Sequence, residues 1–143
     1  MRLAVVGCGA VGRSVVDLAA EHGHEVVAVA DSRSAAVDPA GLDADALLDR
    51  KDREGVVGDA DPDDALAAAY DALVEATPTT LGDAEPGFSH VTRALDRDRH
   101  VVLANKGPVA ERYADVREAE AASAGSVLFE ATVGGAIPVL GTV

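Results

Sequence analysis

The chain alternates short apolar runs with segments of helical spacing, and this alternation constrains its fold more than any other feature. Apolar runs that predict strands occupy residues 3–6, 26–30, 72–76, the stretch from 101, and 127–131. Segments between them predict helices at 10–21, 44–53, 62–70, 89–97 and from 108 to before 125, while 32–45 is expected to be a loop. Strands separated by helices predict right-handed crossovers, and therefore an α/β fold with a doubly wound parallel sheet.

A glycine-rich turn follows the first predicted strand and opens the first predicted helix. It reads Gly7-Cys8-Gly9-Ala10-Val11-Gly12, the spacing G-x-G-x-x-G. Such a turn lets a backbone approach a pyrophosphate at a helix N-terminus. Asp31 lies 19 residues beyond Gly12, at the end of the second strand, where a carboxylate can accept hydrogen bonds from an adenosine ribose. We therefore predict a Rossmann domain that binds NAD or NADP. The alternative is a glycine turn without a ligand.

Residues near Asp31 leave the choice of dinucleotide open. Asp31 favours NAD, whereas Arg33 could pair with the 2′-phosphate of NADP, and Ser32 could donate a hydrogen bond to either. Alternatively, Arg33 is a solvated charge that pairs with Asp38. Thr77, after the third strand, could contact the nicotinamide end, but simple turn chemistry before a proline explains it equally.

Lys106 is one of only two lysines in the chain, and it stands just beyond the strand that begins at residue 101. Ligands of open α/β sheets bind at the carboxyl ends of the strands. Lys106 is therefore a candidate site residue. The competing interpretation is a lysine that extends from the strand end into solvent.

Two motifs later in the chain are similar to motifs of a known enzyme family. The turn Asn105-Lys106-Gly107-Pro108 and the segment Glu130-Ala131-Thr132-Val133-Gly134-Gly135-Ala136-Ile137-Pro138, together with the glycine turn, resemble the N-terminal part of homoserine dehydrogenases. The resemblance implies interconversion of L-homoserine and L-aspartate 4-semialdehyde with NAD(P), in threonine and methionine biosynthesis. It places Lys106 between nicotinamide and substrate as an assisting group, and it suggests that Lys51 reaches an NADP phosphate.

The resemblance also implies a cation site and a second domain. A monovalent cation such as Na⁺ would be held by Glu130, Val133, Gly135 and Ile137, although an ordinary glycine hinge accounts for the same residues. Residues 1–132 would form the NAD(P)-binding domain, and 133–143 would begin a linker to a substrate and dimerisation domain. The family's main catalytic lysine would then lie beyond Val143. We therefore expect an incomplete, inactive portion of a homo-oligomeric enzyme. The alternative is a free-standing dinucleotide-binding module or sensor.

The amino-acid composition limits which kinds of molecule the protein is expected to bind. The formal net charge is −13, which opposes binding to nucleic acid or anionic membranes and leaves a small-molecule substrate as the expected ligand. No apolar stretch reaches the ~20 residues of a membrane span, and a lone Cys8 cannot form an internal disulfide, so we expect a cytoplasmic protein. Low lysine with abundant alanine and aspartate suggests a halophilic source.

Overall fold

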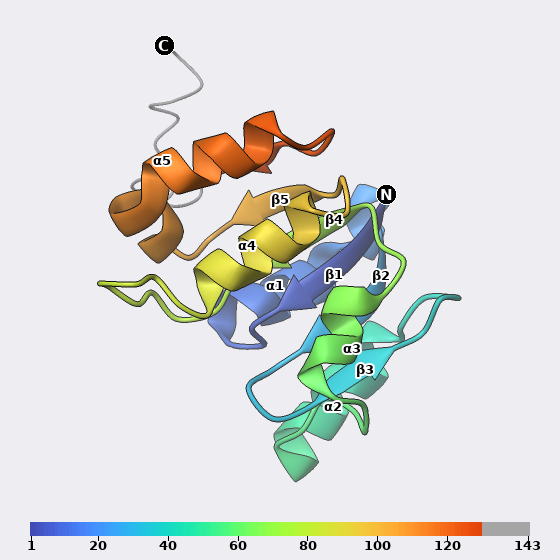
Figure 1. Cartoon of the computed structure of the whole chain (residues 1–143). Helices are drawn as coiled ribbons and strands as arrows, with labels where there is room; N and C mark the ends of the chain where they lie inside the picture. The colour runs from blue at the N-terminus through green and yellow to red at the C-terminus, as the bar shows by residue number, and fades with distance from the viewer. Residues whose placement is uncertain (130–143) are drawn as a thin grey trace.

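A computed structural model describes residues 1–129, which form a six-stranded sheet between two layers of helices (Figure 1). The sheet order is β3-β2-β1-β4-β5-β6, and every pairing is parallel except that of β2 with β3. The strands are β1 (Arg2–Val6), β2 (Glu25–Ala30), β3 (Ala35–Val37), β4 (Ala72–Glu75), β5 (His100–Leu103) and β6 (Val127–Leu128). The predicted Rossmann architecture is confirmed. The expected final strand is present at Val127–Leu128, and the rest of its predicted span lies outside the described residues.

The helices divide between the two faces of the sheet. They are α1 (Ala10–Leu18), the 3₁₀ turn η1 (Ala20–His22), α2 (Ala44–Glu54), α3 (Pro62–Ala67), α4 (Gly87–Leu95) and α5 (Gly107–Ala121). Side chains of α1 and α2 pack on one face in a cluster that includes Val16 and Leu47. Side chains of α3, α4 and α5 pack on the other face with Leu66, Val91 and Val116. Within residues 1–129, no helix is long and apolar enough to cross a membrane.

Local sequence explains where the helices begin and end. Asp43 accepts a hydrogen bond from the Ala46 amide at the start of α2, and Gly55 ends that helix in the left-handed conformation with φ 75°. Asp61 is the N-cap of α3, and its carboxylate accepts a hydrogen bond from the Asp63 amide. The Asp64 carboxylate in turn accepts a hydrogen bond from the Asp61 amide. The sequence Asp61-Pro62-Asp63-Asp64 predicts this cap, because it offers an N-cap residue, a proline at the first helical position and acidic residues in the first turn.

Two expectations about elements are wrong. Residues 32–45 are not entirely a loop, because Ala35–Val37 forms the antiparallel edge strand β3, which pairs with the end of β2 through a tight turn at Asp31. Three small apolar residues are too few to show a strand period. The helix expected to reach Tyr70 ends at Ala67. Tyr70 instead turns into the core, with 1% of its surface exposed, and donates a hydrogen bond to the Leu66 carbonyl.

Candidate functional site

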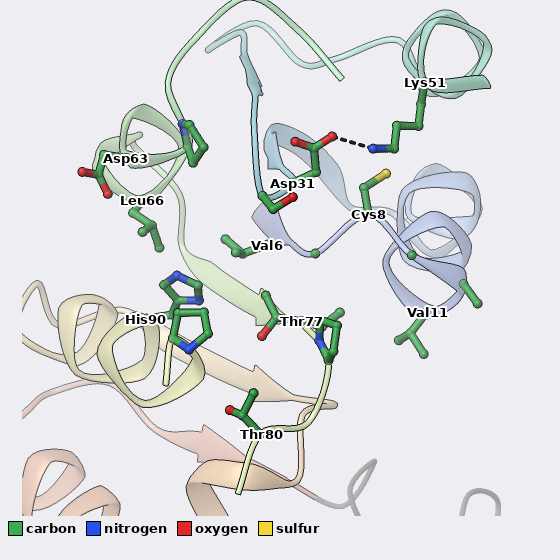
Figure 2. Close-up of a pocket in the computed structure, with 18 residues that line it drawn as sticks. Val6, Cys8, Val11, Asp31, Lys51, Asp63, Leu66, Thr77, Thr80 and His90 are labelled. Atoms are coloured by element: carbon green, nitrogen blue, oxygen red, sulfur yellow. Dashed lines mark hydrogen bonds and ion pairs between the residues drawn. The ribbon is translucent and has the colours of Figure 1, made fainter. Parts of the chain in front are cut away.

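A cavity of about 820 Å³ opens at the carboxyl ends of β1, β2 and β4 (Figure 2). Loops that follow these strands supply its floor, and α2, α3 and α4 contribute side chains to its walls. The predicted residues that line it are Gly7, Cys8, Gly9, Ala10, Val11, Asp31, Ser32 and Thr77, joined by Lys51. Within residues 1–129, three predicted site residues do not line it: Gly12, Arg33 and Lys106. The structure therefore gathers most of the predicted nucleotide site around one cavity.

The three glycines of the turn after β1 differ in what a Cβ atom at each position would contact. Gly7 has φ +98°, and a Cβ there would lie 2.5 Å from the backbone of Ala76. A Cβ on Gly12 would lie 1.8 Å from the carbonyl oxygen of Gly7, so the helix can pack against the turn only without a side chain. Gly9, the first residue before α1, has no atom within 4 Å of its Cβ position. The structure thus leaves room above Gly9, beside the backbone amides that open the helix.

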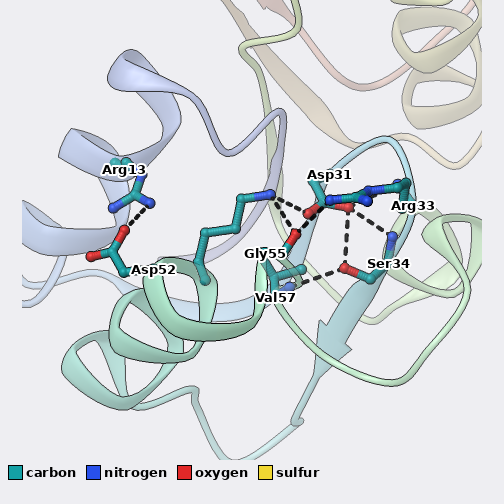
Figure 3. Close-up of polar contacts among 8 residues, drawn as sticks. Arg13, Asp31, Arg33, Ser34, Asp52, Gly55 and Val57 are labelled. Carbon is teal, nitrogen blue, oxygen red and sulfur yellow. Dashed lines mark hydrogen bonds and ion pairs between the residues drawn. The ribbon is translucent and has the colours of Figure 1, made fainter.

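The Asp31 carboxylate is held firmly at the end of β2 (Figure 3). Its Oδ1 accepts hydrogen bonds from the Arg33 amide at 2.8 Å, the Ser34 amide at 2.7 Å and the Ser34 hydroxyl at 3.1 Å. Its Oδ2 lies 2.6 Å from Nζ of Lys51, which also donates to the Gly55 carbonyl at 3.2 Å. Burial by itself raises the pKa of Asp31, but the Lys51 ammonium and these donors outweigh it and lower the pKa.

Arg33 does not form the surface pair considered from the sequence. Its Nη2 donates to the Gly55 carbonyl at 3.0 Å, while the Asp38 carboxylate accepts from the Ala40 amide. The proposed pairing with Asp38 is therefore wrong, because the turn at β2 directs the guanidinium towards the end of α2. Arg33 and Lys51 consequently meet at the same carbonyl, close to Asp31.

A polar cluster lies where β4 and β5 end, formed by the buried Glu75 and Asn105 and by the partly buried Thr77 and His90, which line the cavity. Glu75 is fully buried, and its Oε1 accepts hydrogen bonds from the Thr77 amide at 2.9 Å and the Thr77 hydroxyl at 2.5 Å. Nδ2 of Asn105 donates to Glu75 Oε2 at 3.3 Å and to the Thr77 hydroxyl at 3.1 Å. His90 Nδ1 lies 3.7 Å from Glu75 Oε1.

The surroundings of Glu75 determine its ionisation. Burial raises the pKa of Glu75, but the neighbouring His90 and the two Thr77 donors outweigh burial and bring the pKa below its ordinary value. A carboxylate therefore persists inside the protein at neutral pH. The sequence analysis missed Glu75 and His90 as site residues. An acidic residue that ends an otherwise apolar strand is the signal that could have identified Glu75.

Lys106 lies at the expected edge of the sheet but outside the cavity wall. It directly precedes α5, its side chain is exposed, and its amide donates to the Thr79 hydroxyl at 3.2 Å. Its neighbour Asn105 is buried in the polar cluster and accepts a hydrogen bond from the Gly107 amide at 2.9 Å. The backbone on both sides of Lys106 is therefore held by hydrogen bonds, while its side chain is exposed.

The predicted cation site cannot be placed on this structure. Glu130, Val133, Gly135 and Ile137 all lie outside the described residues. Among residues 1–129, no group of three or more histidine, cysteine, aspartate or glutamate side chains is arranged to hold a metal ion.

Known proteins resemble the chain over almost its whole length. A homoserine dehydrogenase of Methanocaldococcus jannaschii is 31% identical over 98% of this chain and 47% of its own length. The crystal structure of homoserine dehydrogenase from Thermoplasma acidophilum superimposes with a TM-score of 0.89 at 28% identity, over 99% of this chain and 46% of that one. Over almost its whole length, the chain is similar to homoserine dehydrogenases. It spans about half the length of these two relatives.

Two further comparisons bear on the family and the fold of the chain. Residues 1–81, more than half of the chain, match the family described as Glutamate/Leucine/Phenylalanine/Valine dehydrogenase. The chain belongs to that family. That match includes the glycine turn and Asp31 but ends before Asn105, so it covers the part of the domain that precedes the Asn-Lys-Gly-Pro turn. A hyperthermophilic archaeal homoserine dehydrogenase in complex with NADPH has a TM-score of 0.81 at 20% identity, over 99% of this chain and 47% of that one, which shows the shared fold.

Proposed function

We propose that this chain is the NAD(P)-binding part of an oxidoreductase that interconverts L-homoserine and L-aspartate 4-semialdehyde. The observation that carries the proposal is the cavity that joins the glycine turn to Asp31 at the carboxyl edge of the sheet. The similarity to homoserine dehydrogenases supports the reaction, and the NADPH complex of a structural neighbour supports the class of cofactor. The alternative of a binding module without catalysis has no observation in its favour beyond the cavity itself.

The residues that line the cavity fit a dinucleotide. The open space at Gly9 and the amides that begin α1 suit a pyrophosphate, because the helix N-terminus offers N–H groups and a positive dipole. Asp31 and Ser32 would face the adenosine ribose. Thr77 would face the nicotinamide half, where its hydroxyl is already fixed by Glu75 and Asn105.

The Lys51–Asp31 ion pair bears on the choice between NAD and NADP. With its carboxylate free, Asp31 would accept hydrogen bonds from ribose hydroxyls, whereas Lys51 and Arg33 would neutralise a 2′-phosphate. We propose that the site accepts both dinucleotides and that Lys51 supplies the affinity for NADP.

Lys51→Ala is expected to weaken NADP⁺ binding by about tenfold, the loss typical of a charge-assisted contact, and to change NAD⁺ binding much less. Titrations of both dinucleotides by isothermal calorimetry measure the difference. Arg53→Ala is the matched control, because Arg53 lies on the same helix and pairs with Asp49 at the surface. A parallel loss of both affinities, or no loss, would exclude a phosphate contact for Lys51.

The proposed reaction assigns Lys106 to the reacting end of the cofactor. A bound nicotinamide supplies the chemistry by accepting or returning a hydride. The ammonium of Lys106 would donate a hydrogen bond to the substrate oxygen and stabilise the charge that develops there. Its place beside the buried Asn105 supports a fixed starting point for the long side chain.

Lys106→Ala is expected to lower kcat by about a hundredfold in an active homoserine dehydrogenase that contains this domain, in line with the loss of one stabilising donor. Steady-state oxidation of homoserine, followed by NADPH absorbance, gives the value. Lys106→Arg keeps the charge and should retain part of the activity. Glu118→Ala, an exposed change on α5, serves as the control for expression and folding. Unchanged turnover in Lys106→Ala would remove the lysine from the mechanism.

A further inference from the structure

Thr77 lines the cavity, and the hydrogen bonds of its hydroxyl determine which kind of ligand group it can bind. A threonine hydroxyl has one proton to donate and two lone pairs that can accept. The proton is directed to Glu75, because Oγ1 lies 2.5 Å from Glu75 Oε1 and an ionised carboxylate can only accept. One lone pair accepts a hydrogen bond from Nδ2 of Asn105 at 3.1 Å. Within residues 1–129 no further donor reaches the other lone pair, so the free position of this hydroxyl is an acceptor.

The direction of these hydrogen bonds follows from backbone amides, which can only donate. The Gly107 amide donates to Oδ1 of Asn105 at 2.9 Å, so the other end of that side chain is its NH₂ group. The Thr77 amide donates to Glu75 Oε1 at 2.9 Å, so this oxygen already acts as an acceptor. His90 Nδ1 lies 3.7 Å from the same oxygen, which is beyond hydrogen-bond distance. Glu75 and Asn105 are 0% and 1% exposed, which limits competition from solvent.

The sheet order places Thr77 on the opposite side of the glycine turn from Asp31. The turn follows β1, which lies between β2 and β4; Asp31 follows β2, and Thr77 follows β4. Figure 2 shows the end of β1, at Val6, between the two side chains. A dinucleotide with its adenosine ribose at Asp31 and its pyrophosphate at the turn therefore extends its nicotinamide half towards Thr77. The Lys106 amide, which donates to the Thr79 hydroxyl, lies on this same side.

We propose that Thr77 is a specificity residue for the nicotinamide carboxamide, with its hydroxyl accepting a hydrogen bond from the carboxamide NH₂ and Glu75 acting as the positioning residue that takes the hydroxyl proton. The carboxamide NH₂ is the only hydrogen-bond donor on a nicotinamide ring. This proposal rests on the proposed function, since it assumes that the cavity takes a dinucleotide. It predicts selection against dinucleotides whose ring substituent lacks an N–H group.

Binding of 3-acetylpyridine adenine dinucleotide tests the contact, because this analogue of NAD⁺ keeps the charge and the carbonyl but carries a methyl group in place of NH₂. Calorimetric titration of the wild type is expected to show about fivefold tighter binding of NAD⁺, the value of one hydrogen bond. In Thr77→Val, which keeps the shape but lacks the hydroxyl, the two affinities should become equal. Thr77→Ser should retain the preference. Thr92→Val makes the same change on α4 outside this cavity and is the control.

ADP-ribose, which lacks nicotinamide, separates failure of this proposal from failure of the proposed function. If wild-type protein binds neither NAD⁺ nor ADP-ribose, the proposed function fails. If it binds both, equal wild-type affinity for NAD⁺ and the acetylpyridine analogue, or a preference that persists in Thr77→Val, overturns the carboxamide contact. Weakening of ADP-ribose in Thr77→Val by as much as NAD⁺ overturns the assignment to the nicotinamide half. Thermal unfolding of each variant establishes that it is folded.

The positioning role of Glu75 has a readout that a loss of stability does not change. The ratio of two dissociation constants measured on one variant cancels the fraction of that variant that is unfolded. Glu75→Ala frees the Thr77 proton to donate to the acetyl carbonyl, so the ratio should fall towards one. Glu75→Gln, whose amide oxygen can still accept that proton, should keep the preference for NAD⁺. An unchanged ratio in Glu75→Ala, or its loss in Glu75→Gln, would overturn the positioning role, and the Thr77 variants test the contact whether or not Glu75→Ala folds.

Discussion

Gly12→Ala is expected to lower the free energy of unfolding by about 3 kcal/mol, the upper range for forcing an extra methyl group into a packed site. The new Cβ would lie 1.8 Å from the Gly7 carbonyl oxygen, which is backbone and cannot rotate away. Either α1 must move off the sheet or the glycine turn must open. Chemical denaturation in urea measures the change, and dinucleotide binding should be lost with it.

Gly9→Ala is the matched comparison. Gly9 has a negative φ of −87°, and its Cβ position has no atom within 4 Å, so alanine should leave stability almost unchanged. The methyl group would instead occupy the space proposed for the pyrophosphate, and dinucleotide affinity should fall. If Gly9→Ala and Gly12→Ala lost stability alike, or if Gly12→Ala were as stable as the wild type, the assignment of separate roles to the two glycines would be wrong.

Glu75→Ala is expected to lower the free energy of unfolding by about 3 kcal/mol, because it leaves buried hydrogen-bond donors without an acceptor. The Thr77 amide and hydroxyl and the Asn105 amide all donate to this carboxylate, and each would lose an acceptor. Glu85→Ala, a change at a partly exposed carboxylate near the start of α4, is the control. A loss below about 0.5 kcal/mol in urea denaturation, the usual size of a surface substitution, would show that the cluster contributes little.

Because the pKa of Glu75 is lowered in the folded protein, its contribution to stability depends on pH. Its pKa is lower in the folded protein than its ordinary value of 4.5, so the unfolded chain binds the proton more tightly. The stability that Glu75 contributes is therefore fully present above pH 4.5 and is lost as the pH falls below that value towards the folded-state pKa. Glu75→Gln, which does not titrate, should be less stable near neutral pH but lose less stability on acidification. An identical acid dependence in both proteins would contradict this.

The sequence predicted the order of the elements well because periodicity and caps are local. Most strand and helix positions agree to within two or three residues, and the Asp61 cap is where the Asp-Pro-Asp-Asp sequence placed it. Ala35–Val37 was missed because a three-residue edge strand is decided by its partner β2 rather than by its own pattern. The end of α3 was misplaced because burial of Tyr70 outweighs helix continuation.

The site was predictable only where a motif marks it. The glycine turn and Asp31 are recognisable from spacing, and Asp31 lines the cavity together with every residue of the turn except Gly12. The Lys51–Asp31 pair joins residues 20 positions apart through the packing of α2, and the Glu75 cluster joins β4, α4 and β5. No local pattern encodes such contacts, since they depend on how the helices settle on the sheet.

Direct binding of the dinucleotide tests the central claim most closely. Calorimetric titration of the folded chain with NADP⁺ and with NAD⁺ is predicted to show one saturable site for each, competed by ADP-ribose and weakened in Gly9→Ala. Folded protein that binds neither dinucleotide, or that binds one with an affinity unaffected by Gly9→Ala, would contradict the account.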